Sequence, residues 1–139
     1  MYRRILVPVD FTPKNARAID AARELAELSG GEVTLVHVVE TLGEDSDPEL
    51  EGFYRRLETQ AEEKIAELLA TLGDTHFDKR SVVLLGHRVR TLLGFAEEDG
   101  SDVIVLSSHR VDPDHPTADW MTISYRLSIL AQCPVLLVK

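Results

Sequence analysis

The stretch from Val103 to Val138 decides the fold, and it reads VIVLSSHRVDPDHPTADWMTISYRLSILAQCPVLLV. Its apolar ends, Val103–Leu106 and Pro134–Val138, are typical of short buried strands. Between them lie a long polar loop and then apolar residues at helical spacing, which are Trp120, Ile123, Leu127 and Leu130. The stretch therefore predicts strand, loop, helix and strand. The loop leaves the carboxyl end of a strand, where open α/β sheets bind ligands.

The same alternation extends toward the amino terminus. Short, mostly apolar segments predict three further strands, at Ile5–Val9, Glu32–Val39 and Ser81–Leu85. Apolar residues at helical spacing predict helices that end near Ser29, run from Leu50 to Leu72, and run from Val89 to Ala96. Strands that are continuously apolar and alternate with helices predict a parallel sheet with helices on both faces. We therefore expect one α/β domain over residues 1–139.

Capping residues predict where the first two helices begin. Thr12 followed by Pro13 is typical of an N-cap and a proline at the first helical position. Ser46 and Glu49 have the spacing of a capping box, with Pro48 in the first turn. We therefore expect Thr12 and Ser46 to cap these helices.

The composition excludes several classes of function. The formal net charge of −9, from 24 acidic and 15 basic residues, repels nucleic acid and anionic membranes. No apolar run approaches the roughly 20 residues of a membrane-spanning helix, and the amino terminus has no hydrophobic signal region. One cysteine, Cys133, forms no internal disulfide, so we expect an inert, packed thiol and a cytoplasmic protein.

At this point four blocks of the sequence resemble the universal stress protein family, in order and in spacing. The blocks are YRRILVPVDFTPKNARAIDAARELA, EVTLVHVVE, GHRVRTLLGFAEEDGSDVIVLSSH and the terminal CPVLLVK. The resemblance implies a Rossmann-like fold of the adenine nucleotide alpha hydrolase type, with a five-stranded parallel sheet of order 3-2-1-4-5. It also implies a homodimer, commonly formed through the last strand. Here that strand comprises Pro134, Val135, Leu136, Leu137 and Val138, an apolar edge that needs covering.

Nucleotide-binding members of this family resemble one another in a Gly-x-x-Gly, nine residues, Gly-Ser/Thr pattern after the fourth strand. In this chain the three glycine positions fall on Ser107, Arg110 and Met121, with Thr122 as the surviving hydroxyl, and the last glycine of the chain is Gly100. A residue with a Cβ in a left-handed phosphate nest costs about 1–2 kcal/mol, so three such residues cost roughly 3–6 kcal/mol. The chain therefore resembles the members that lack the glycine-rich ATP-binding motif.

The loop around these positions is also unfavourable for a polyphosphate. Asp112, Asp114 and Asp119 would repel phosphate groups, while Pro113 and Pro116 remove two backbone donors. We therefore expect no cofactor, with ATP possible but not favoured.

The adenine side of the expected crevice is better kept. Pro8, Asp10, Val38 and Leu106 match positions that line the adenine and ribose pocket in binding members. Asp10 has two interpretations, a ligand contact or a turn carboxylate beside Thr12. The candidate ligand crevice comprises Pro8, Asp10, Val38, Leu106, Ser107, Ser108, His109, Arg110, Met121 and Thr122.

Catalysis and metal binding are disfavoured by spacing. Ser107, Ser108 and His109 with Asp10 lack the Gly-x-Ser-x-Gly elbow of a nucleophile, so no catalytic residue is predicted. His109 and His115 with Asp112 and Asp114 fit no standard metal site, so no metal is predicted.

Structural predictions are also made for His37 and Arg110. His37 lies in an apolar strand, and we expect a hydrogen-bonded core histidine there. Arg110 is expected to pair with Asp112 or Asp114 and close the crevice, with binding of another anion as the alternative.

The sequence thus predicts a non-enzymatic, dimeric stress-response protein of the universal stress type that lacks tight ATP binding and acts through a protein partner. It predicts no nucleic-acid partner and no membrane insertion. The alternative is an adenine-nucleotide sensor or weak ATPase with an atypical phosphate loop.

Overall fold

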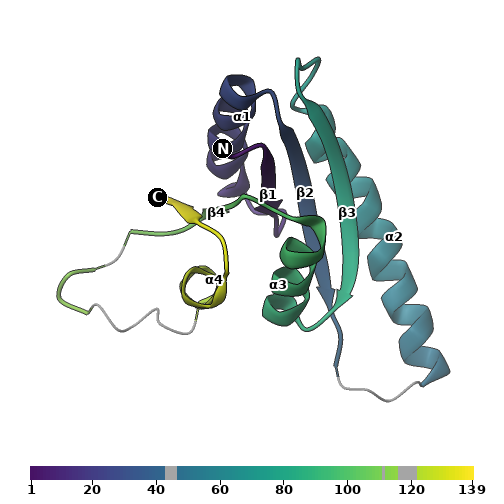
Figure 1. Ribbon diagram of the computed structural model, residues 1–139. Coiled ribbons are helices and arrows are strands. Elements are labelled where there is room, and N and C mark those ends of the chain that lie inside the picture. The colour runs from purple at the N-terminus through teal and green to yellow at the C-terminus, as the bar shows by residue number, and fades with distance from the viewer. Residues whose placement is uncertain (43–46, 111, 116–121) are drawn as a thin grey trace.

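A five-stranded parallel sheet of order β3-β2-β1-β4-β5 forms the centre of the computed structural model, which describes residues 1–42, 47–110, 112–115 and 122–139 (Figure 1). The strands are β1 (Arg4–Pro8), β2 (Glu32–Glu40), β3 (Asp78–Gly86), β4 (Val103–Ser107) and β5 (Val135–Val138). The helices are α1 (Asn15–Ser29), α2 (Pro48–Ala70), α3 (Arg88–Asp99) and α4 (Ile123–Leu130). The predicted fold class and strand order are confirmed.

The order of the strands reverses between β1 and β4. The chain builds the sheet outward from β1 through β2 to β3, then returns to the other side of β1 with β4 and β5. Ile5 is paired with Val33 of β2 on one side and with Val103 of β4 on the other. Such a switch point opens a crevice at the carboxyl ends of the strands.

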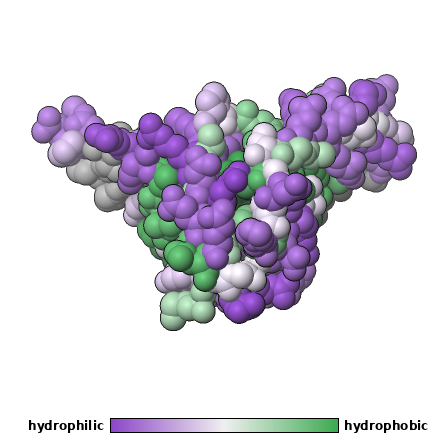
Figure 2. Space-filling model, turned by 90° about the horizontal axis from the view of Figure 1, so that it is seen from above, coloured by the Kyte–Doolittle hydropathy of each residue, from purple (hydrophilic) through white to green (hydrophobic). Residues whose placement is uncertain are grey.

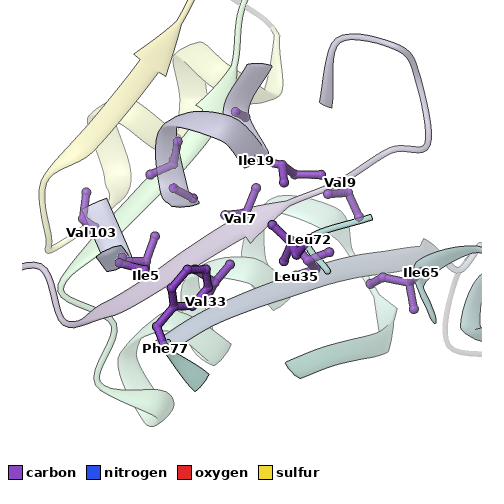
Figure 3. Close-up of a cluster of buried hydrophobic side chains, with 14 residues drawn as sticks. Ile5, Val7, Val9, Ile19, Val33, Leu35, Ile65, Leu72, Phe77 and Val103 are labelled. Carbon is purple, nitrogen blue, oxygen red and sulfur yellow. The ribbon is translucent and has the colours of Figure 1, made fainter. Parts of the chain in front are cut away.

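Each face of the sheet has its own apolar core. Ile5 and Val7 of β1 pack with Ile19 of α1 and Ile65 of α2 on one face (Figure 3). Their neighbour Leu6 points to the opposite face and joins a cluster that includes Leu92, Ile104 and Leu127. Because side chains alternate along a strand and both faces are covered, the central strands read as continuous apolar runs.

The predicted cap of α1 is wrong. The helix begins at Asn15, and the residue at the cap position is Lys14, which provides no side-chain hydrogen bond. The hydroxyl and amide of Thr12 instead donate to the Asp10 carboxylate, at 2.7 and 3.0 Å. Thr12 therefore belongs to a turn that Asp10 organises, and the helix starts two residues later than predicted.

The cap of α2 also differs from the prediction. Asp47 is the N-cap, and its carboxylate accepts the amide of Glu49 at 3.0 Å. Pro48 occupies the first turn as predicted. Ser46, the expected cap, lies outside the described residues, as does Trp120, which was assigned to the last helix.

The strand β5 lies at one edge of the sheet and pairs with β4 from Ile104↔Val135 to Ser107↔Val138. Pro134 precedes it, and its carbonyl accepts the amide of Ile104 at 3.0 Å. Leu136, in the middle of this strand, is 43% exposed. In the part of the chain that the structure describes, no helix has the length and apolar character needed to cross a bilayer.

Candidate functional site

A cavity of about 260 Å³ lies at the switch point, where β1, β2 and β4 end; we call it the crevice. Its floor is apolar and comes from the strand ends, while the loops that follow the strands and the start of α4 supply polar groups. The lining residues are Pro8, Val9, Asp10, Lys14, Asn15, Val36, His37, Val38, Arg88, Leu92, Leu106, Ser107, Ser108, His109, Thr122, Ile123 and Ser124.

The first wall of the crevice is the turn after β1. Asn15 is 2% exposed, and its Oδ1 accepts the amide of Asp10 at 3.1 Å. Its Nδ2 donates to the Ser107 hydroxyl at 3.4 Å, across 92 residues of sequence. Asn15 therefore ties the exit of β1 to the exit of β4 and fixes the width of the crevice between them.

The Asp10 carboxylate is held by its own turn. Burial raises its pKa, but hydrogen bonds from the side chain and amide of Thr12 and from Asn15 outweigh burial, so the pKa lies below the ordinary value. The carboxylate is therefore ionised at neutral pH, and one oxygen already accepts two hydrogen bonds from Thr12. This geometry supports the turn interpretation of Asp10.

The second wall is built around His37 on β2. We expected a core histidine, but the side chain is half-buried and lines the crevice. Its Nδ1 lies 2.7 Å from the carbonyl of Val9, and since a carbonyl only accepts, Nδ1 carries the proton. Burial is the main cause that lowers the pKa of His37, with the charge of Arg88 adding to it. The imidazole is therefore neutral at pH 7.

The third wall is the segment that leaves β4. The amide of Ser108 donates to the carbonyl of Val138 at 2.7 Å, and Lys139 Nζ donates to the carbonyl of His109 at 3.2 Å. The Thr122 hydroxyl accepts the amide of Tyr125 at 3.3 Å and so caps α4. The hydroxyl that survives from the family pattern therefore already serves the helix.

Eight of the ten predicted crevice residues line this one cavity, namely Pro8, Asp10, Val38, Leu106, Ser107, Ser108, His109 and Thr122. Met121 lies outside the described residues. Arg110 is exposed and is not among the lining residues.

The expected closure of the crevice by Arg110 is not observed. Within the described segments Arg110 forms no ion pair with Asp112 or Asp114. Asp112 instead accepts from the amide of Asp114 at 3.0 Å and pairs with His115 Nδ1 at 3.0 Å. The pairing of Asp112 with His115 is local because the two residues lie three apart in a tight turn.

Sequence reasoning missed five polar side chains of the crevice: Lys14, Asn15, His37, Arg88 and Ser124. A signal for Asn15 was present, because helical spacing places it on the same face as Ala18, Ile19 and Ala22. A polar residue on an apolar helix face needs an internal partner. No comparable pattern marks Arg88, whose position depends on how α3 lies against β2.

The charge of the crevice differs from that of the whole chain. Among the described residues that line it, Lys14 and Arg88 are cations and Asp10 is the single carboxylate. Arg88 also lies 3.5 Å from Glu40, but both side chains are more than 40% exposed, so this pair is weak. A chain with a net charge of −9 thus places two cations at its crevice.

The serine hydroxyls at the exit of β4 form hydrogen bonds of their own. The Ser107 hydroxyl accepts from Asn15, and the Ser108 hydroxyl donates weakly to the carbonyl of His109, so neither contact is that of a nucleophile with a base. No group of three histidine, cysteine or acidic side chains converges within residues 1–42, 47–110, 112–115 and 122–139.

Comparison with known proteins shows which family the sequence matches. The model of the universal stress protein family matches residues 1–139. A universal stress protein A homolog of Coxiella burnetii is 29% identical over 144 residues, which cover 99% of this chain and 96% of that protein. A universal stress protein of Methanocaldococcus jannaschii is 26% identical over 129 residues, which cover 78% of each chain.

Solved structures share the fold. A universal stress protein from Lactobacillus plantarum gives a TM-score of 0.81 at 23% identity, with 99% of this chain and 98% of that chain covered. A universal stress protein from Archaeoglobus fulgidus in complex with dAMP gives 0.72 at 20% identity, with 99% and 98% covered. A universal stress protein in complex with cAMP gives 0.62 at 19% identity, with 100% and 99% covered.

Proposed function

Because the chain belongs to the universal stress protein family, we propose that it is a non-enzymatic stress-response protein that lacks tight ATP binding. We further propose that it works as a homodimer and through contacts with a partner protein. The observation that carries this proposal is the exit of β4. Ser107, Ser108, His109 and Arg110 stand there, and no glycine follows Gly100.

A triphosphate needs several free donors on one side of the crevice. The Thr122 hydroxyl is engaged as the cap of α4, and the turn beyond β4 carries Asp112, Pro113 and Asp114. Acidic groups repel phosphate, and proline has no amide to donate. The crevice volume of about 260 Å³ also lies below the roughly 300–1,000 Å³ of typical small-molecule pockets. These features support weak rather than tight ATP binding.

ATP titration by calorimetry tests this proposal. We expect a dissociation constant weaker than about 100 μM, which corresponds to roughly −5.5 kcal/mol. Small molecules released by heat from the purified protein should contain no stoichiometric nucleotide. Tighter binding, or nucleotide that copurifies in equal amount with the chain, would overturn it.

A second candidate is an adenine-nucleotide sensor, and a specific observation favours it. Pro8, Val38 and Leu106 line the crevice together with the cations Lys14 and Arg88, and relatives of the same fold were solved with dAMP and with cAMP. An apolar slot with cations at its mouth suits a base with a single phosphate better than a triphosphate.

AMP titration separates the two candidates. If the crevice is a sensor site, AMP binds more tightly than ATP, and Asp10→Asn weakens AMP binding. The matched control is Asp20→Asn on the exposed face of α1, which changes the same charge away from the crevice. Equal effects of the two substitutions would contradict a crevice site.

The proposed dimer follows from the edge strand. β5 presents an unpaired edge in the described sheet, and Leu136 is 43% exposed. An apolar edge is normally covered or paired. Sedimentation should therefore give twice the chain mass of 15.5 kDa, and Leu136→Lys should give the monomer mass. A monomeric wild-type protein would contradict this part of the proposal.

A further inference from the structure

A second cavity of about 320 Å³ lies between the ends of α3 and α4 and the start of β4; we call it the α3–α4 groove. It shares no lining residue with the crevice. The lining residues are Leu93, Ala96, Glu97, Gly100, Ser101, Ile104, Leu130, Ala131, Gln132 and Cys133.

The floor of the α3–α4 groove is apolar, and its lip extends into solvent. Ala96 and Ile104 are buried at the bottom, whereas Leu130 is 49% exposed at the lip. Ile129, beside it on α4, is 60% exposed. Figure 2 shows apolar surface gathered on the side of the molecule where Figure 1 draws α4 and β5. The exposed apolar surface thus continues beyond the cavity, which favours an extended occupant over a small molecule.

Two helix carboxyl ends give this groove a negative potential. α3 ends at Asp99, followed by Gly100, and α4 ends at Leu130, followed by Ala131, so both ends contribute to the lining. Neither helix has a basic residue in its last turn. The carboxyl end of a helix carries about half a negative charge, which favours a cation nearby.

Glu97 adds a full negative charge at the rim. It is exposed and forms no ion pair within the described part of the chain, whereas Asp99 is already paired with Arg80 and Arg4. No lysine or arginine is among the lining residues that the structure describes. Burial raises the pKa of the Cys133 thiol, so this lining group is neutral at pH 7. The groove therefore combines an apolar floor with an unpaired negative rim.

We propose that the α3–α4 groove binds a segment of a partner protein in which an aliphatic side chain stands next to lysine or arginine. The aliphatic group fills the floor between Ala96 and Leu130, and the cation lies against Glu97 and the two helix ends. This inference rests on the proposed function, in which the chain acts through a protein partner. It assigns that contact to residues that neither line the crevice nor belong to β5.

The test uses two peptides of equal length against the full chain. The first is acetyl-Gly-Leu-Lys-Leu-Lys-Gly-amide, and in the second glutamate replaces both lysines. Titration is followed by amide chemical shifts. The lysine peptide should shift the amides of Gly100, Ser101, Ala131 and Cys133, and the glutamate peptide should bind at least about tenfold more weakly. Equal binding of the two peptides, or shifts confined to the crevice, would overturn the proposal.

Charge exchange at the rim sharpens the test. Glu97→Lys should weaken the lysine peptide about tenfold and strengthen the glutamate peptide. The matched control is Glu27→Lys, on the exposed face of α1, which changes the net charge equally and should leave both affinities within about twofold. The same loss in both variants would show that only net charge matters, and the groove assignment would fail.

Leu130→Ser tests the apolar lip and the competing occupant. Because Leu130 is half-exposed, the variant should fold, which the dispersion of its amide spectrum checks. We expect weaker binding of the lysine peptide and an unchanged sedimentation mass. A dimer that dissociates in Leu130→Ser would assign this face to a second copy of the chain and overturn the proposal. The ATP titration tests the proposed function and does not depend on the peptide titrations. A wrong groove proposal and a wrong proposed function can therefore be told apart.

Discussion

The ring of Phe11 lies against the imidazole of His37, with 4.3 Å between the ring centroids and an interplanar angle of 34°. Phe11 follows β1 and has a φ of 65°, in the left-handed region that side chains with a Cβ rarely adopt. Lys64 Nζ of α2 lies 5.7 Å from the same ring centroid. The strained backbone at Phe11 thus places its ring over His37 at the side of the crevice.

The burial of His37 makes the free energy of unfolding depend on pH. Because the pKa of His37 lies below the ordinary value of about 6.5 in the folded chain, the unfolded chain binds a proton first as the pH falls. The free energy of unfolding should therefore decrease as the pH falls through about 6.5, until it passes the folded-state pKa. Urea unfolding at about pH 7.5 and pH 5.5 should show a smaller decrease in His37→Gln than in wild type. His76→Gln, at an exposed histidine, should keep the wild-type decrease.

The φ of Phe11 predicts an unusual order of two variants. Both Phe11→Ala and Phe11→Gly lose the ring, but glycine adopts the left-handed conformation without the cost of a Cβ. Phe11→Gly should therefore be more stable than Phe11→Ala by about 1 kcal/mol, the reverse of the usual penalty for glycine. Urea unfolding of the two proteins measures the difference. A more stable alanine variant would show that this turn relaxes when the ring is removed.

Replacing Asn15 by an apolar residue of similar size should destabilise the protein. In Asn15→Leu the part-buried amide of Asp10 loses its acceptor, and we expect a cost of about 1 kcal/mol, at the low end of the range for an unsatisfied donor. Glu24→Ala, at an exposed position of the same helix, should change the free energy of unfolding by less than about 0.5 kcal/mol. Equal effects of the two substitutions, measured by urea unfolding, would mean that the bond to Asp10 contributes nothing.

Two glycines predict opposite responses to alanine. A Cβ on Gly31 would lie 2.0 Å from the carbonyl oxygen of Arg3, because the chain enters β2 directly against the start of β1. Gly94 lies within α3 with no atom near an added Cβ. Gly31→Ala should therefore lower the melting temperature strongly, whereas Gly94→Ala should stabilise α3 by up to about 1 kcal/mol. A neutral Gly31→Ala would mean that the two strand ends separate easily.

The helices and strands were predictable because their signals are local. The apolar runs of β1 and β4 and the helical spacing in α1 and α3 each arise within a few residues, and all of these elements are confirmed. The caps failed for a related reason. Thr12 could form hydrogen bonds either with the start of α1 or with the Asp10 carboxylate. The tight turn after β1 favours the bonds to Asp10. A cap motif alone cannot rank such competing hydrogen bonds.

The crevice was predictable in outline but not in its inner contacts. The resemblance predicted Pro8, Val38 and Leu106, which lie near the carboxyl ends of their strands and line the crevice. Arg110 was expected to pair with Asp112 or Asp114, but Asp112 pairs with His115, three residues away. Lys14 and Arg88 enter the crevice from two different helix starts, whose approach depends on packing rather than on any motif.

By itself, the sequence determined the alternation of strands and helices, the burial of both sheet faces and the absence of glycine after Gly100. Periodicity and composition are properties of neighbouring residues, so they can be read from the sequence without knowledge of the fold. Only the tertiary structure decided that Asn15 reaches Ser107 across 92 residues, and that the carboxyl ends of α3 and α4 meet at one groove. Those contacts exist because β4 returns to lie beside β1, and that placement follows from the packing of the whole sheet.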